Sequence, residues 1–501
     1  MRRLLPLPIL AAAALVLPAC GSSGSGSGST DPATAAPASA LVYANVAIRP
    51  KGDLKRSVDA AGRKILNGAD PGRKIQQGLD QQLSKAHMSY AEDVRPWLGE
   101  RAAFFMTSIS GGSASGAAII DSKDDGKAKS TLDKAVKESG DKTKTESVNG
   151  VDVHVATDGT SAYAVSDGLV YAGTEGGVRD AINARKGSSL AEASAYENAT
   201  GKVTKDGLAL FYVDAPKLLD AAAQANPSSA ALIESLRNSP QVRNLKPTAG
   251  AVTVSSDSIA FEAPATKEAS TPRAVADLPA DSWLALSIGN FGDNLRRSLQ
   301  ALNSTGQGNM LGLLERQFRS QTGLDLQKDL LSWLSDASGF VAGSPTSFAA
   351  GAILGSKDPT ASRKAVVRIG RTLHARAGLP VSPKPNGFSI RSSRGDVAIQ
   401  SKGDKVIAAL GKDAVAKTTK PSSTLSADPT FQAAVKQLGD NAKPQFYLSL
   451  PTALSYAAIG GSAGDPQFQA AQPYLRHFTS LVFGTAQGSS GTVGRIVIGL
   501  K

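Results

Sequence analysis

The chain has 501 residues, a formal net charge of +12 and one cysteine. A single thiol excludes an intramolecular disulfide, and the length is ample for hydrophobic cores that need none. The basic excess suits an anionic neighbourhood such as phospholipid headgroups or wall polymers, but charge alone does not identify a ligand.

The first residues have the pattern of an export signal. Two arginines precede an apolar run from Leu4 to Ala19, which is shorter than the roughly 20 residues that span a membrane. The sequence Leu17–Cys20, LPAC, resembles the lipobox of bacterial lipoproteins. The resemblance implies cleavage after Ala19 and a diacylglycerol on the sulfur of Cys20. The alternative is an ordinary secretory signal followed by an unmodified cysteine.

This signal predicts a location. We expect residues 1–19 to be removed and Cys20 to anchor the protein in the cell membrane, facing outside the cytoplasm. Nucleic acid is then not an expected partner. Residues 20–36 are almost entirely Gly, Ser, Ala, Thr and Pro, which bury too little apolar area to offset their ordering entropy. They are predicted to be a lipid-anchored linker.

The remaining sequence contains an internal repeat. The segment DVRPWLGERAAFF, 93–105, is weakly similar to DLLSWLSDASGFV, 329–341. The match aligns Trp97 with Trp333 at an offset of 236. Further matches in the same order are Asn149-Gly150 with Asn386-Gly387 and Phe211-Tyr212 with Phe446-Tyr447. The pattern predicts two tandem homologous domains, 37–266 and 278–501, joined by a linker at 267–277.

Each half shows one order of elements. A strand is followed by helices, a short helical turn that ends in Trp-Leu, two strands, a helix and strand hairpins. Asp358 before Pro359 is typical of a helix start, and Asp167-Gly168 between alternating strands predicts a type I′ turn. Strands joined by hairpins form antiparallel sheets. We therefore predict an α+β fold, each half a mainly antiparallel sheet with helices packed on one face.

Three segments resemble a known family. They are LPADSWLALSI at 278–288, GLDLQKDLLSWL at 323–334 and DVRPWLGERAA at 93–103. The chain is similar to exported or lipid-anchored bacterial proteins, notably actinobacterial ones, that carry a domain of unknown function, DUF3352. The resemblance implies a fold and a location, and it supplies no catalytic residue.

Local motifs for chemistry are weak. Asp121–Leu132 begins like a calcium loop but has Lys123 and Leu132 where acids are required, so a helix cap is the better interpretation. Ser462 lies in a G-x-S-x-G match that follows a helical pattern rather than a strand, which favours a glycine-rich loop. The four histidines have no metal-ligand spacing, so no metal is expected. No P-loop or dinucleotide fingerprint occurs in a strand-helix context, so no cofactor is expected either. Trp97 and Trp333 could stack on a ligand, but a core position is favoured.

The most one-sided charge lies in the predicted helix 361–378, which contains no acid. Its cations are Arg363, Lys364, Arg368, Arg371 and Arg376. They form either a solvated face or a contact surface for anionic lipid headgroups or wall polymers. We expect a non-enzymatic envelope lipoprotein that binds or scaffolds. An exported hydrolase with dispersed catalytic residues and a carrier of a lipid or hydrophobic ligand remain alternatives. The oligomeric state does not follow from the sequence.

Overall fold

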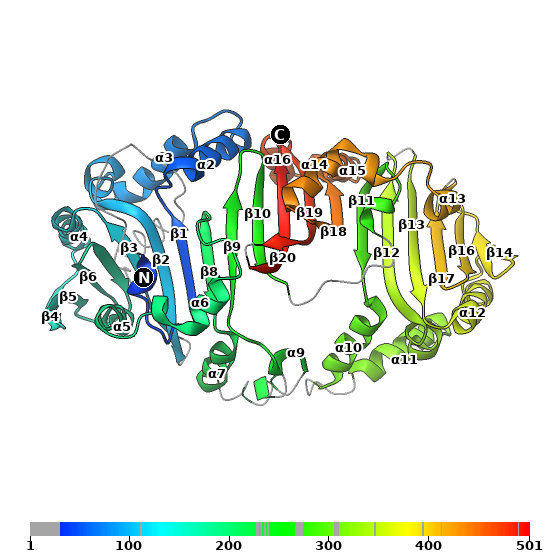
Figure 1. Cartoon of the computed structure of the whole chain (residues 1–501), viewed down its shortest axis with the longest axis horizontal. Helices are drawn as coiled ribbons and strands as arrows, with labels where there is room; N and C mark the ends of the chain where they lie inside the picture. Colours follow the sequence, from blue (N-terminus) through cyan, green and yellow to red (C-terminus); the bar gives the residue numbers. More distant parts are fainter. Residues whose placement is uncertain are drawn as a thin grey trace. The chain divides into compact units, whose positions relative to one another are not determined.

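The computed structural model describes residues 31–501, and its elements are drawn in Figure 1. The ranges not described within that span are 111–112, 227–229, 231–232, 235–236, 238–239, 266–273, 305–309, 345–346, 393–394, 412 and 489. Cys20 and the predicted signal lie outside the described residues. The chain divides into two compact units, one ending at Pro264 and the other beginning at Ala265, with Gly488–Val493 and Leu500 grouped with the first. Helices and antiparallel strands make both units α+β, as predicted.

The first unit is built on one ten-stranded antiparallel sheet. Its strands, in sheet order, are β4 (Thr143–Val148), β5 (Val151–Ala156), β6 (Ala162–Ser166), β7 (Leu169–Gly173), β3 (Ser113–Ser122), β2 (Leu98–Ser110), β1 (Val42–Ala47), β8 (Ala209–Val213), β9 (Thr248–Val254) and β10 (Ser258–Pro264). The first strand of the chain lies inside the sheet, between β2 and β8. In register, Tyr43 of β1 is opposite Phe105 and Tyr212.

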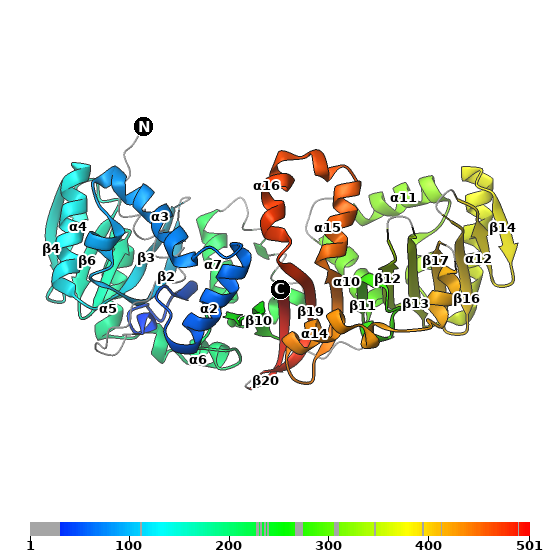
Figure 2. The ribbon, with the colours of Figure 1, turned by 90° about the horizontal axis from the view of Figure 1, so that it is seen from above.

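Helices cover both faces of this sheet, so the prediction of helices on one face is wrong. The helices are α2 (Gly52–Ile65), α3 (Pro71–Leu83), α4 (Asp125–Ser139), α5 (Glu175–Lys186), α6 (Ser194–Thr200), α7 (Ala215–Ala225) and α9 (Pro240–Arg243), with shorter turns η1 (Pro32–Thr34), η2 (Ser84–Ala86), η3 (Tyr90–Val94) and η4 (Leu190–Glu192). Figure 2 shows strands β3 and β6 between α4 and α5.

The physical reason is that the central strands are apolar on both sides. Ile120 and Val170 belong to a core with α3 and α4, whereas their neighbours Ile119 and Tyr171 belong to a second core with α5 and α6. Successive side chains of a strand point to opposite faces, so a strand that is apolar throughout needs cover on both.

The second unit has the same sheet order. Its strands are β14 (Val381–Lys384), β15 (Gly387–Ile390), β16 (Val397–Lys402), β17 (Lys405–Leu410), β13 (Ala349–Ser356), β12 (Leu334–Ala342), β11 (Ser282–Ile288), β18 (Lys443–Ser449), β19 (Phe478–Gly488) and β20 (Gly491–Leu500). Neighbours from β14 to β19 are antiparallel, and β20 pairs with β19. The strand that opens this unit, β11, again lies inside the sheet.

Helices also cover both faces of the second sheet. They are α10 (Phe291–Ser304), α11 (Met310–Thr322), α12 (Pro359–Ala377), α13 (Ala414–Thr419), α14 (Pro429–Leu438), α15 (Leu450–Ile459) and α16 (Pro466–Leu475), with turns η5 (Val275–Asp277), η6 (Leu326–Leu331), η7 (Leu425–Ala427) and η8 (Ser462–Gly464). Trp333, Phe388 and Val406 pack with α10 and α12. Ala409 packs with Ala414 of α13 in a separate cluster.

Helix starts follow local sequence rules. Several helices begin with an Asp at the N-cap and a Pro at the first helical position, as at Asp70, Asp358, Asp428 and Asp465. In each case the carboxylate accepts a hydrogen bond from a backbone N–H of the first turn. The cap satisfies a donor that the helix cannot, and proline supplies the required φ without needing an N–H partner. The predicted start at Asp358-Pro359 is confirmed.

Hairpin turns confirm one prediction and shift another. Asp167 and Gly168 have φ of 53° and 76°, as a type I′ turn requires. The turn between β4 and β5 is Asn149-Gly150, whereas that between β14 and β15 is 385–386, because Lys384 pairs with Gly387. The structural offset here is therefore 236, one less than the sequence match of the two Asn-Gly pairs indicates.

The folded part of the first unit begins before residue 37. Asp31 caps the turn η1 by accepting a hydrogen bond from the Ala33 backbone N–H at 3.0 Å. Ala33, Ala35 and Ala36 are fully buried in the core that contains Tyr43. Residues 31–36, which their composition assigns to the linker, thus belong to the fold. Within the described residues, each helix is too short or too polar to cross a bilayer.

Candidate functional site

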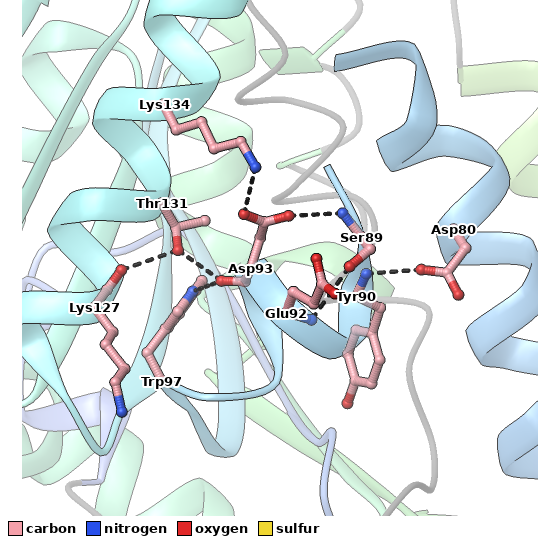
Figure 3. A network of polar contacts seen from close by, with 9 residues as sticks. All are labelled: Asp80, Ser89, Tyr90, Glu92, Asp93, Trp97, Lys127, Thr131 and Lys134. Atoms are coloured by element: carbon pink, nitrogen blue, oxygen red, sulfur yellow. Dashed lines mark hydrogen bonds and ion pairs between the residues drawn. The ribbon is translucent and has the colours of Figure 1, made fainter. Parts of the chain in front are cut away.

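A network of hydrogen bonds organises the approach to β2 in the first unit (Figure 3). The turn η3 is a single π-helical turn, capped by the Ser89 hydroxyl, which accepts from the Glu92 backbone N–H at 3.2 Å. Asp93 closes the turn from the other end, because its Oδ2 accepts from the Ser89 backbone N–H at 2.7 Å. Its Oδ1 pairs with Nζ of Lys134, on α4, at 2.7 Å.

The same aspartate fixes Trp97. The indole Nε1 donates to the backbone carbonyl oxygen of Asp93 at 2.8 Å, and Thr131 Oγ1 donates to that carbonyl at 2.6 Å. Trp97 is 1% exposed and packs with the core on the α3 and α4 face. The network therefore links α4, the π turn and the start of β2 through one residue.

The second unit contains the same arrangement. In η6, also a π-helical turn, Asp329 Oδ2 accepts from the Asp325 backbone N–H at 2.7 Å. The Asp329 carbonyl oxygen accepts from Trp333 Nε1 at 2.9 Å. Arg368 of α12 takes the place of the lysine, with its Nη1 3.0 Å from Asp329 Oδ1. The core position expected for Trp97 and Trp333 is confirmed, because Trp333 is 2% exposed.

This pairing changes the interpretation of the basic helix. The sequence presents five unopposed cations, but Arg368 is opposed by Asp329, 39 residues earlier. Arg363, Lys364 and Arg371 are exposed, and no carboxylate among the described residues lies within ion-pairing distance of them. The side chain of Arg376 lies outside the described residues. The cationic face that the structure describes therefore has three unopposed charges.

Other sequence motifs take structural roles. Asp124 caps α4 by accepting from the Lys127 backbone N–H at 3.0 Å, which confirms the helix-cap interpretation. Ser462 lies in η8, which follows α15, so no strand precedes it as a nucleophile elbow would need. In the described ranges, no three His, Cys, Asp or Glu side chains gather as metal ligands would.

The second unit also contains an open groove of about 630 Å³. It lies where β11 begins and β18 ends, against the N-terminal ends of α14 and α15. Its lining residues are Ala280, Asp281, Ser282, Trp283, Gly343, Ser344, Asp428, Thr430, Tyr447, Ser449, Pro451, Thr452 and Ser455. The volume falls within the range of small-molecule sites. A smaller depression of about 370 Å³ in the first unit borders Asp93 and Lys134, which already pair with each other.

Aromatic rings and hydroxyls dominate the groove. Trp283 is half-buried and stacks on Tyr456, with ring centroids 4.8 Å apart and planes 28° apart. Burial, and secondly the charge of Asp428, raise the pKa of the Tyr447 hydroxyl to about 12. Tyr447 therefore keeps its proton at neutral pH and can act as a donor or an acceptor.

No motif in the sequence predicts this groove. Its lining comes from segments near 281, 344, 429 and 450, which only the sheet brings together. Ser282 and Trp283 fall in a strand pattern, where an aromatic residue predicts packing rather than binding. The one available signal was the tryptophan itself, which lies near the start of β11 rather than in a helical turn.

A family model described as "Protein of unknown function (DUF3352)" matches residues 7–495. The chain belongs to the DUF3352 family. The match spans both units of this DUF3352 protein, so the family model covers the pair and not one unit alone. No curated protein matches the sequence at a significant level.

Two solved structures show a low similarity to the DUF3352 protein. They are crystal forms I and IV of TP0453, each at 8% sequence identity and a TM-score of 0.16. The match to form I covers 77% of this chain and 95% of the TP0453 chain, and the match to form IV covers 76% and 93% of the respective chains. At these TM-scores the likeness supports no statement about this protein.

Proposed function

We propose that this DUF3352 protein is a non-enzymatic binding or scaffolding lipoprotein of the cell envelope, held outside the cytoplasm by a lipid on Cys20. The groove beside Trp283 is the observation that carries the binding role. Three of its hydroxyls bond to one another or to the backbone: Ser449 Oγ lies 3.2 Å from Thr452 Oγ1, and Ser455 Oγ donates to the Pro451 carbonyl. The two carboxylates among the described lining residues are already engaged, Asp281 by Lys417 and Asp428 by the Phe431 backbone N–H, which favours binding over hydrolysis.

We also propose that the two units are tandem copies of one domain. The identical sheet order supports this: β1 lies between β2 and β8 in the first unit, and β11 lies between β12 and β18 in the second. The two π turns support it further: each joins an aspartate, a tryptophan and a cation, and aspartates and tryptophans are both 236 residues apart. An overlay of the units with equivalent strands in a different order would exclude the duplication.

The lipid anchor is tested by Cys20→Ala. We expect this variant to incorporate no labelled fatty acid and to appear in the medium or as an unprocessed precursor, because the thiol that receives the lipid is gone. The measurement is metabolic labelling with cell fractionation. Ser23→Ala, three residues further along, is the matched control and should label like the wild type. Processed Cys20→Ala protein retained on membranes would contradict the anchor.

A contact between α12 and an anionic surface is tested separately. The chain produced from Gly21 keeps every described residue and has a formal charge of +10, since the +12 total loses two arginines. It should bind vesicles of anionic phospholipid at low salt and dissociate at high salt, because exposed charges act over about 8–10 Å. Reversing Arg363, Lys364 and Arg371 to Glu should weaken co-sedimentation at least about tenfold. Arg368 is left unchanged, because its reversal would also break the pair with Asp329.

The control for this test keeps the net charge equal. Lys74, Lys129 and Lys137 are exposed in the first unit, and reversing all three makes the same change in total charge. If this control weakens binding as much as the α12 variant, only the overall charge acts and α12 is no contact surface. Purified wall polymer in place of vesicles distinguishes the second anionic source.

A further inference from the structure

The groove beside Trp283 combines a flat aromatic surface with many hydroxyls. The indole is supported from one side by Tyr456, so a ligand that rests on it meets a ring already held in place. Hydroxyl groups surround it on the side chains of seven lining residues: Ser282, Ser344, Thr430, Tyr447, Ser449, Thr452 and Ser455. A hydroxyl both donates and accepts, so this lining is matched to a ligand that does the same.

The charges of the groove disfavour an anion. Among the described residues, its lining includes Asp281 and Asp428 but no Lys, Arg or His. Asp281 is paired from outside the lining by Lys417 Nζ, at 2.7 Å, and Asp428 is held by the Phe431 backbone N–H, also at 2.7 Å. A carboxylate or phosphate placed here would meet two carboxylates, of which only Asp281 is paired with a cation.

Two buried donors in the lining lack a partner. Ser282 is 4% exposed, and neither its Oγ nor Nε1 of Trp283 has a hydrogen-bond partner among the described residues. Native proteins leave few such groups unsatisfied, because each costs about 1–3 kcal/mol. Their position, adjacent in sequence at the groove, indicates a site that gains partners when a ligand oxygen settles beside Trp283.

The N-terminus of α15, which borders the groove, lacks a side-chain cap. Ser449 is the N-cap residue of α15 but makes no capping hydrogen bond. In the first unit, the N-cap residue of α7 is Asp214, directly after β8, and its carboxylate accepts from the Lys217 backbone N–H at 3.2 Å. The side chain of Ser449 thus leaves the first turn of α15 uncapped, whereas an aspartate caps the matching helix in the first unit.

We infer that this groove binds a neutral sugar residue of an oligosaccharide or polysaccharide. The inference rests on the proposed binding role but not on the lipid anchor. A pyranose has apolar C–H groups on its faces, which suit the indole, and hydroxyls around its edge, which suit the polar wall. Uncharged hydroxyls satisfy the donors of Ser282, Trp283 and α15 without adding charge next to Asp281 and Asp428.

Intrinsic fluorescence provides the test. The sequence has three tryptophans, and two of them, Trp97 and Trp333, are core residues, so quenching by acrylamide reports mainly on Trp283. The probes are galactotriose and mannotriose, each compared with the trimer of its own uronic acid. We expect at least one neutral trimer to bind and protect Trp283 from acrylamide. Its uronic acid counterpart should bind at least about tenfold more weakly, because the carboxylates repel.

Variants assign the binding to the groove. Trp283→Ala should lower the affinity for the neutral trimer at least about tenfold. Thr430→Glu is a second variant for the case in which loss of the ring stack disturbs folding. It fills the groove at the second residue of α14, where a negative charge is favourable to the helix, and should lower the affinity as much. Tyr474→Ala removes an exposed aromatic side chain that lies outside the groove lining and should change nothing.

Three results would overturn the inference: no binding of either neutral trimer, equal or tighter binding of the uronic trimers, or wild-type affinity in both groove variants. A protein that labels normally with lipid yet binds no neutral trimer would refute this inference and leave the location proposed for it intact.

Discussion

Trp97→Ala should lower the free energy of unfolding by about 3–5 kcal/mol, the usual cost of truncating a large buried aromatic side chain. Trp97 is almost fully buried and contacts a core that includes Leu98 and Leu132. Its removal leaves a cavity at the point where α4, the π turn and β2 meet. It also removes the indole donor to the Asp93 carbonyl.

Chemical denaturation followed by far-ultraviolet circular dichroism measures this effect. Trp97→Phe is the matched variant, since it keeps most of the ring volume but removes the Nε1 donor. It should lower the free energy of unfolding less than Trp97→Ala does, and the difference measures the part of the loss that is due to the cavity. Trp97→Ala with an unchanged unfolding transition would show that the indole contributes no packing energy.

Asp329→Ala should lower the free energy of unfolding by about 1.5–3 kcal/mol, the range for a hydrogen bond to a charged group. Asp329 is 6% exposed, and its carboxylate closes the π turn through the Asp325 backbone N–H. The alanine variant leaves that N–H without its acceptor. Asp329→Asn keeps an acceptor oxygen of the same reach, so it should recover part of the loss.

The ion pair itself should contribute little. The Arg368 side chain is 58% exposed, and pairs with so exposed a member are worth roughly 0–1 kcal/mol. Arg368→Gln should therefore cost less than Asp329→Ala in the same denaturation experiment. If the two variants cost the same, the carboxylate acts through the arginine and not through the turn.

Local rules in the sequence predict much of this fold. Three predicted features depend on neighbours within a few residues, and all are confirmed: the helix start at Asp358-Pro359, the Asp167-Gly168 turn and the burial of both Trp97 and Trp333. The helices on the second face were missed because the short strands β6 and β7 are apolar at nearly every position. Such a run does not reveal by periodicity which side is covered.

Features built from distant segments could not be predicted in the same way. The Asp329–Arg368 pair joins a π turn to the middle of a helix. The helical pattern of 361–378 shows that Arg368 lies on the polar face but not what opposes it. The groove requires the β11 and β18 registers and two helix starts at once, and no single segment of its lining carries a motif.

If Cys20 carries the proposed lipid, the burial of Ala33, Ala35 and Ala36 limits how far the first unit can reach from the bilayer. Only eleven residue steps separate Cys20 from Asp31, the first residue that the structure describes. However they are arranged, eleven steps span at most about 40 Å, compared with about 60 Å had the fold begun at residue 37. With Cys20 lipidated as proposed, the first unit would stay close to the membrane surface. Targets of that unit would then lie in the layer next to the headgroups and not deep in the wall.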